Sequence, residues 1–261
     1  MTMHLAAYYQ SVDPAAAYVQ LAAIADSQLT VNSPRIQVPT LNQVVLASAG
    51  AENAVAPLVR LVAPSLTAKW RHQLSPLNVA AAAAVLPMSP ARIVDLRDDP
   101  LVLVPSEQLT AELNSNPVAA QIQWVLVWFA DAKPAPVTGP IMTARATVAN
   151  ALVAGAWTLN TLTFDEQIPR GRYQVVGFRP MSTNMIAARL VIPGAGYRPG
   201  ALAAANISDV TGDIFRMGNL GVLGEFEDVD NLQVESLAAA ADAAAVQQYL
   251  VDMIQLRAGP G

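Results

Sequence analysis

After Thr30 the chain consists of short segments rich in Val, Ile, Thr and aromatic residues, and proline, asparagine or glycine repeatedly interrupts them. Short segments of this composition between turn-forming residues are typical of β-strands. The 19 prolines also blunt strand edges, which discourages unwanted pairing with other strands. The pattern therefore predicts a mainly β protein with antiparallel strands.

The first half of the chain contains six expected strands, at Arg35 to Val38, Gln43 to Ala49, Ala56 to Val62, Thr67 to His72, Arg92 to Leu96 and Leu101 to Val104. Two further segments there are ambiguous. Val79 to Leu86 contains five consecutive alanines that favour a helix, but the prolines on either side allow only a short one. Pro105 to Leu113 fits a short helix or a strand, and we favour the helix.

The second half contains eight expected strands, at Gln121 to Ala130, Met142 to Ala149, Trp157 to Phe164, Tyr173 to Phe178, Met185 to Ile192, Asp213 to Met217, Val222 to Phe226 and Leu232 to Glu235. Turn-forming pairs such as Pro193-Gly194 and Pro199-Gly200 separate them. Eight strands joined by such turns are what an antiparallel β-sandwich or jelly roll requires.

Helices are expected at the two ends of the chain. Asp13 is a suitable N-cap and Pro14 a suitable first helical residue, so the alanine-rich stretch as far as Asp26 is expected to be helical. A second alanine-rich stretch, from Ser236 to Leu256, carries apolar residues at helical spacing and predicts a C-terminal helix.

The polar, turn-rich segment 114–117 is the best candidate for a domain boundary. The expected organisation is a helical segment at 1–28, a first β-sandwich half that resembles a jelly roll at 29–116, a second jelly roll at 117–235, and a C-terminal helix and tail at 236–261. The two halves share no convincing sequence repeat.

Hydrophobic residues make up 53% of the chain and charged residues only 13%, about half of the usual charged fraction. The longest strictly apolar run, Val79 to Leu86, is far shorter than the roughly 20 residues that a membrane-spanning helix needs. A chain so poor in charge must bury more surface than one globule can, and large protein interfaces would do so.

The net charge is −5, and the 15 basic residues, of which only Lys69 and Lys133 are lysines, form no cluster. Direct binding of nucleic acid is therefore not expected. The preference for arginine suits fixed or interfacial ion pairs better than solvated charge. The absence of cysteine excludes disulfides, zinc–cysteine sites and thiol nucleophiles. Residues 1–28 lack the pattern of a secretory signal, so export is not expected.

No set of residues predicts a catalytic, cofactor or metal site. Only two histidines exist, and we expect His4 to be a solvated terminal residue and His72 a partly exposed strand residue. The acidic cluster is expected to form a solvated or subunit-bridging rim, with a cation site as the alternative. It consists of Glu225, Glu227, Asp228 and Asp230.

Four further patterns are expected to be structural. The segment 209–212 is expected to form a turn rather than an aspartic-protease motif, and the glycine-rich segment 194–200 lacks the helix start of a phosphate site. Asp95, Asp98 and Asp99 beside Arg92 and Arg97 resemble a charged loop, with a glycosidase carboxylate pair as a remote option. Asn206-Ile207-Ser208 is a formal glycosylation acceptor without supporting context.

Aromatic residues gather on the expected strands of the second half. Trp124 and Trp128 share one sheet face and Phe129 points to the other. With Trp157, Phe164, Tyr173 and Phe178, they are expected to form a sandwich core with some outward aromatic surface, and a carbohydrate-stacking platform is the functional alternative.

In outline the sequence resembles the jelly-roll capsid proteins of tailless icosahedral viruses, and more specifically the double jelly-roll major capsid proteins of membrane-containing bacteriophages. The resemblance rests on the leading segment Pro14 to Asp26, the two proline-punctuated halves, and the run from Gln121–Phe129 through Tyr173–Phe178 to Leu190–Ile192. It implies trimeric capsomers whose subunits each carry two upright jelly rolls, and a terminal helix near an internal membrane. The first half is short for a full jelly roll, so a single jelly roll with extensions remains an alternative.

The expected function is therefore that of a non-enzymatic, self-assembling capsid subunit in a virion, without cofactors. Its expected partners are copies of itself in trimers, other capsid proteins and a lipid membrane that the N-terminal helix would contact. Two alternatives remain: a soluble β-sandwich module that binds a ligand or glycan, and a filament or sheath subunit.

Overall fold

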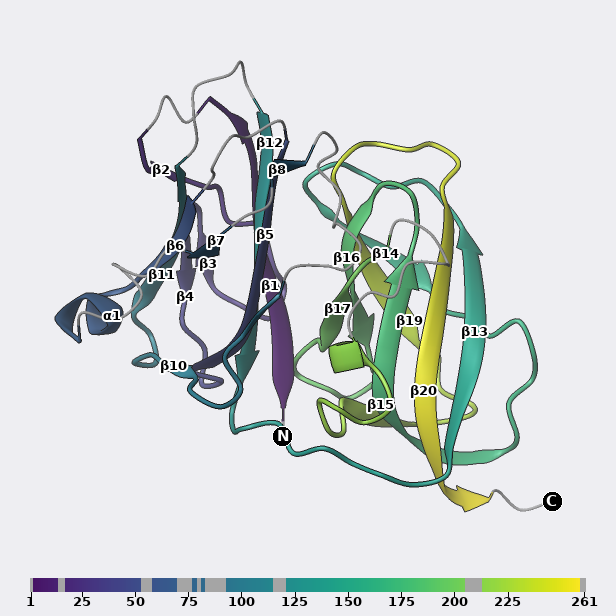
Figure 1. Ribbon diagram of the computed structural model, residues 1–261. Helices are drawn as coiled ribbons and strands as arrows, with labels where there is room; N and C mark the ends of the chain where they lie inside the picture. Colours follow the sequence, from purple (N-terminus) through teal and green to yellow (C-terminus); the bar gives the residue numbers. More distant parts are fainter. Residues whose placement is uncertain are drawn as a thin grey trace. The chain divides into compact units, whose positions relative to one another are not determined.

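The computed structural model describes residues 2–13, 17–52, 58–69, 77–78, 81–82, 93–114, 121–204 and 213–258. The regular secondary structure in these ranges consists of strands, one short α-helix and one short 3-10 helix (Figure 1). The strand pairs with a defined register are antiparallel, except for the two-residue parallel pairing of β5 with β8. The prediction of a mainly β protein with antiparallel sheets is confirmed.

The described residues form two compact units. The N-terminal unit takes in those from Leu5 to Lys133, and the C-terminal unit those from Pro134 onward together with the first residues up to His4. Of the predicted boundary segment 114–117, Asn114 ends strand β11 and residues 115–117 lie outside the described residues.

The N-terminal unit contains two sheets. The first has the order β1-β12-β5-β10, with β8 and β9 also paired to β5, and the second has the order β3-β4-β11-β6-β7, with β2 also paired to β11. The strands are β1 (Met3–Val12), β2 (Val19–Gln20), β3 (Val31–Asn32), β4 (Arg35–Gln37), β5 (Gln43–Glu52), β6 (Leu58–Val62), β7 (Leu77–Asn78), β8 (Ala81–Ala82), β9 (Val94–Asp95), β10 (Leu101–Val102), β11 (Gln108–Asn114) and β12 (Gln121–Ala130). The helix α1 (Pro64–Ala68) follows β6.

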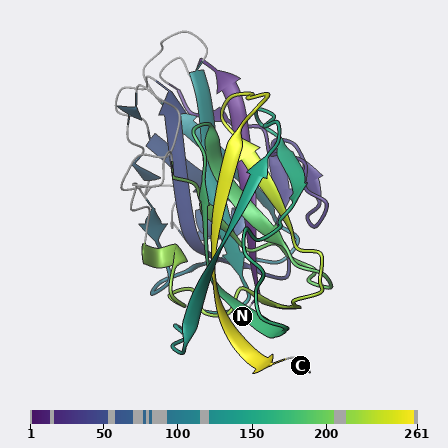
Figure 2. The ribbon, with the colours of Figure 1, turned by 90° about the vertical axis from the view of Figure 1, so that its right-hand side faces the viewer.

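The C-terminal unit also contains two sheets, with the orders β13-β20-β15-β18 and β14-β19-β16-β17. Its elements are β13 (Ile141–Ala149), β14 (Trp157–Thr161), β15 (Gly171–Met181), β16 (Met185–Val191), β17 (Gly200–Leu202), the 3-10 helix η1 (Asp213–Phe215), β18 (Gly224–Glu227), β19 (Gln233–Ala238) and β20 (Val246–Ala258). The long strand β20, yellow in Figure 1 and Figure 2, pairs with β13 on one side and β15 on the other.

Both units repeat one pairing scheme. In the C-terminal unit, the first strand pairs with the eighth, the second with the seventh, the third with the sixth and the fourth with the fifth. In the N-terminal unit the corresponding pairs are β1 with β12, β4 with β11, β5 with β10, and β6 with β7. Each unit therefore has the connectivity of a long antiparallel hairpin that has been rolled up into two sheets.

Large apolar side chains fill the core of each unit. In the N-terminal unit the indole ring of Trp124 on β12 lies against the backbone of Gly50 on β5, where a Cβ atom would come within 2.4 Å of the ring. In the C-terminal unit the Phe178 ring on β15 stacks on Tyr249 of β20 at 5.9 Å between centroids. Ser236 of β19 donates to Gln247 of β20 at 2.7 Å, which joins the two sheets through the core.

The predicted helices at both ends of the chain are wrong. In 1–28 the described residues form β1 and β2, and Leu5 to Tyr8 on β1 are buried, although Pro14 itself lies outside the described residues. The stretch from Ser236 to Leu256 forms the end of β19, a turn, and β20. Alanine has high helix propensity, but tertiary pairing overrides so weak a preference.

Three shorter predictions are also wrong. The sequence favours a helix from Pro105 to Leu113, but Gln108–Asn114 form strand β11. A strand was predicted from Thr67, where the helix α1 ends at Ala68. A strand was also predicted at Asp213 to Met217, where Asp213–Phe215 form η1. In the ambiguous alanine run, Ala81–Ala82 form the short strand β8.

Among the described residues, no helix is long and apolar enough to cross a membrane.

Candidate functional site

Several residues that the sequence singled out cannot be placed. His72, Arg92, the segment 209–212 and the acceptor Asn206-Ile207-Ser208 lie outside the described residues.

The acidic cluster beside β18 is held by local contacts. Glu225 accepts hydrogen bonds from Gln174 at 2.8 Å and Arg172 at 2.6 Å, and both contacts lower the pKa of its carboxyl group against the opposing effect of burial. Asp228 accepts from the amide of Gly171, and Asp230 accepts from the amide of Glu227, each at 2.8 Å. Within the described residues no three His, Asp or Glu side chains group as metal ligands.

The charged loop at 95–99 contains ion pairs rather than a pair of facing catalytic carboxylates. The Arg97 guanidinium binds Asp95 through Nε and Nη2, at 2.9 and 2.8 Å, and this hydrogen bonding lowers the pKa of Asp95. Asp98 pairs at 2.7 Å with Lys133, and both side chains are exposed.

The aromatic residues of β12 do not form an outward surface. Trp124, Trp128 and Phe129 are all buried, although Phe129 points to the face of the sheet opposite to that of Trp124 and Trp128. The expected aromatic core is therefore present on this strand, and a carbohydrate-stacking platform on it is excluded, while Trp157 and Phe164 are partly exposed. Tyr173, which stacks on Phe226 at 5.5 Å, is buried as well.

A buried charge network lies in the C-terminal unit. The carboxylate of Glu235 on β19 accepts from Arg189 Nε on the neighbouring β16 at 2.6 Å, and its second oxygen accepts from Arg198 Nη1. The Arg189 side chain is 1% exposed and its guanidinium lies over the Trp157 ring, 4.1 Å from the centroid. One carboxylate therefore serves two guanidinium groups, one of which also stacks on an indole ring.

His4 extends this network. Its Nδ1 accepts from the backbone amide of Arg198 at 3.2 Å, its Nε2 lies 3.4 Å from Arg189 Nη1, and its ring meets Tyr197 edge-on. The expectation of a solvated terminal histidine is wrong, because His4 is fully buried. The network holds its charges in fixed contacts, which is the chemistry of a structural anchor rather than of a reaction centre.

Sequence reasoning missed this network, although one signal pointed to it. The preference of arginine over lysine predicted fixed ion pairs, and Arg189 and Arg198 form them. The glycine-rich segment 194–200 thus carries an anchoring arginine. Nothing in the sequence paired these arginines with Glu235, because a long stretch of chain separates them.

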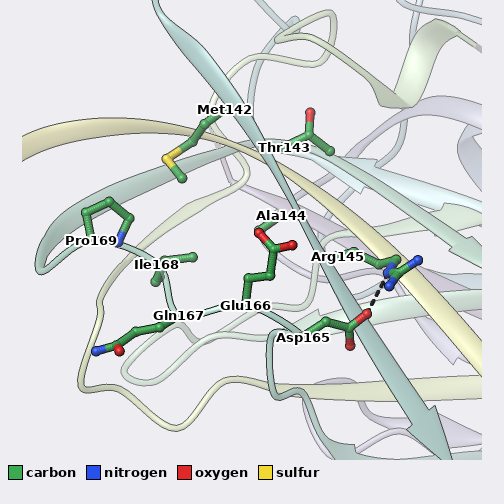
Figure 3. A pocket seen from close by; sticks show the side chains of 9 residues that line it. All are labelled: Met142, Thr143, Ala144, Arg145, Asp165, Glu166, Gln167, Ile168 and Pro169. Carbon is green, nitrogen blue, oxygen red and sulfur yellow. Dashed lines mark hydrogen bonds and ion pairs between the residues drawn. The ribbon is translucent and has the colours of Figure 1, made fainter.

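A further candidate site is the exposed loop after β14, residues 165–170, which we call the clamped loop. Figure 3 shows the cavity on one side of it, about 480 Å³ in volume, with the dashed ion pair between Arg145 and Asp165. Arg145 Nε donates to Asp165 at 2.5 Å and Thr147 donates at 3.0 Å. Burial opposes ionisation of Asp165, but these donors outweigh it and lower the pKa of its carboxyl group.

The other end of the clamped loop is also fixed. The Tyr173 hydroxyl donates to the carbonyl of Pro169, and Gln255 Nε2 donates to the carbonyl of Arg170 at 3.0 Å. Burial, followed by the negative charge of Asp228, raises the pKa of Tyr173, so its hydroxyl stays a proton donor. The loop is therefore held at both ends while its middle faces solvent.

A second cavity, about 490 Å³ in volume, also borders the clamped loop. It shares Gln167 with the first cavity, and it is also lined by Arg170, Gly171, Arg172, Glu227, Asp228, Val229 and Arg257. Val229, at the tip of the turn after β18, is 81% exposed. This end of the C-terminal unit thus combines two concavities, a rigid loop and charges of both signs.

No protein-family model matches the chain, and no curated protein matches it. Among solved structures, the chain is similar to the major capsid protein P2 from Bacteriophage PM2, with 11% identity over 98% of this chain and 100% of that chain and a TM-score of 0.27. It is also similar to a xanthan lyase from Paenibacillus, with 10% identity over 95% of this chain but only 25% of the lyase and a TM-score of 0.22. TM-scores at this level establish neither a shared fold nor a shared function.

Proposed function

We propose that the chain is a self-assembling structural subunit, a major capsid protein with two jelly rolls in tandem, which forms trimeric capsomers in the icosahedral shell of a bacteriophage. The observation that carries the proposal is the rolled pairing scheme, which occurs once in each unit. A jelly roll is a long antiparallel hairpin rolled so that its first and last strands pair, and jelly rolls are frequent in viral capsids.

The composition of the chain supports assembly. A subunit that buries its lateral faces against copies of itself tolerates a surface poor in charge, because homo-oligomeric interfaces are more apolar than ordinary protein surface. With 13% charged residues, the chain fits that role. The absence of a basic cluster fits a shell protein that does not itself bind the genome.

The buried network around Glu235 and the engaged carboxylates beside β18 are consistent with a structural role rather than an enzymatic one. A contact between an N-terminal helix and lipid is not part of the proposal, because β1 and β2 occupy that region. Other capsid proteins remain proposed partners.

Sedimentation velocity and negative-stain microscopy of the purified full chain test the proposal. We expect trimers or closed shells at micromolar concentration. A stable monomer at every concentration would contradict it, and a ligand-dependent melting shift in that monomer would favour a binding module. Open helical tubes would favour a filament subunit instead.

A further inference from the structure

We propose that the clamped loop forms a two-fold contact between two copies of the chain, in which Glu166 of each copy pairs with Arg170 of the other. The inference rests on the proposed function and assigns one surface to the contact between capsomers.

Glu166 and Arg170 both carry a charge that no described residue of the chain neutralises. Glu166 and Arg170 are both exposed, and neither side chain has an ion pair or hydrogen bond with any described residue. Their neighbours differ in this respect, because Asp165 pairs with Arg145 and Arg172 pairs with Glu225. In a chain with so few charges, the loop thus presents an unpartnered acid and an unpartnered base four positions apart.

The charges around the clamped loop differ between its Glu166 side and its Arg170 side. The cavity on the Glu166 side contains one further ion pair, so its unpaired charge is negative. The cavity on the Arg170 side holds Arg170 and Arg257 together with the carboxylates of Glu227 and Asp228, so it carries charges of both signs. A two-fold axis through the middle of the loop would place Glu166 of each copy beside Arg170 of the other, which is the self-complementary pairing that an isologous interface requires.

The clamped loop is held at both ends and is bordered by two cavities. Both ends of the loop are clamped, so little conformational freedom is lost when it docks, and such preorganisation favours binding. Figure 3 shows the Glu166 and Gln167 side chains extending in different directions from the loop. The flanking concavities offer space for the loop of a second copy, while Ile168, which is half-buried, supplies apolar contact at the centre.

A charge swap in the full-length protein tests the contact. Glu166→Arg and Arg170→Glu each place like charges together at two symmetry-related points. Each single variant is therefore expected to form trimers normally but to weaken association between trimers at least about tenfold. The double variant restores opposite charges across the axis, so association is expected to return to within about threefold of the wild type.

The measurements are sedimentation velocity and light scattering over a concentration series, with melting temperatures as a check on folding. Arg35→Glu is the matched control, because Arg35 is an exposed arginine of the N-terminal unit without an ion pair to any described residue, and its association is expected to equal that of the wild type. If the wild type forms shells and the single variants do so equally well, the contact is disproved and the capsid proposal stands. A double variant as weak as the single variants, though folded, would also disprove the pairing. A wild type that stays monomeric contradicts the capsid proposal itself.

Discussion

At the scale of single residues, Glu235 shows how this chain uses its scarce charge. Its carboxylate binds Arg189 and Arg198 together, and Arg189 is as deeply buried as the apolar core residues. A buried cation that loses its counter-charge pays a desolvation cost that no contact offsets. The sequence indicated that the arginines form fixed ion pairs but could not indicate their partner.

Replacement of Glu235 by Gln keeps the size of the side chain and removes its charge. We expect the variant to lose about 3–5 kcal/mol of unfolding free energy, since Arg189 stays buried without a counter-ion. Denaturant unfolding followed by circular dichroism measures the loss. Glu225→Gln, which breaks an exposed pair, is the matched control, with an expected loss below about 1 kcal/mol. Equal losses in both variants would show that the network contributes no more than a surface ion pair.

Asp165 predicts a pH dependence at the clamped loop. Its pKa is lowered in the folded chain, so its ion pair stabilises the fold above the ordinary pKa of 3.8, and this stabilisation is lost as the pH falls through the lowered value. Asp165→Asn is therefore expected to melt below the wild type near neutral pH, with a difference that vanishes in strong acid. Melting curves across the acidic range measure this, and a difference that persists in strong acid would contradict the ion-pair account.

At the scale of secondary-structure elements, several long interior strands were predictable, whereas the terminal strands and β11 were not. Segments such as Gln121–Ala130 and Gln43–Glu52 are rich in β-branched and apolar residues, which identify them as strands. In β20 the apolar residues fit both the spacing of a helix and the alternation of a strand. Helical spacing connects Tyr249 with Met253, but Tyr249, Val251 and Met253 also alternate, and these three are buried in the sheet.

The position of β20 between two partners predicts its sensitivity to proline. Val251 pairs with Ala144 on β13 and Phe178 on β15, so Val251→Pro removes sheet hydrogen bonding inside the C-terminal unit. We expect a loss of about 1–3 kcal/mol, since a buried backbone group is left without its hydrogen bond. Val246→Pro at the first residue of the strand is the control, because proline is tolerated at a strand start. Thermal unfolding compares them, and equal melting temperatures would contradict a central β20.

At the scale of the whole molecule, two errors in the sequence interpretation had one origin. The first half looked short for a jelly roll because the N-terminal segment was predicted to be helical and Gln121–Ala130 was assigned to the second half. The structure pairs β1 with β12 and β12 with β5, so both strands belong to the first pair of sheets. Pairing between distant strands leaves no local signal, so the sequence alone could not assign them.

This organisation predicts where the chain accepts an insertion. Residues Asp131–Lys133 follow β12 and are exposed, so one glycine inserted between Ala132 and Lys133 is expected to cost less than about 1 kcal/mol. The same insertion between Val127 and Trp128 shifts every later side chain of β12 to the opposite face and is expected to unfold the chain. Melting temperatures compare the two, and equal damage at both sites would contradict a boundary after β12.

The rolled pairing also has a consequence for the order of events during synthesis. In each unit the first strand cannot find its main partner until the last strand has been made, because β1 pairs with β12 and β13 pairs with β20. Long-range strand pairing of this kind folds slowly, because loop closure precedes the favourable contacts. A nascent chain therefore cannot complete either unit until the last strand of that unit, β12 or β20, has been synthesised.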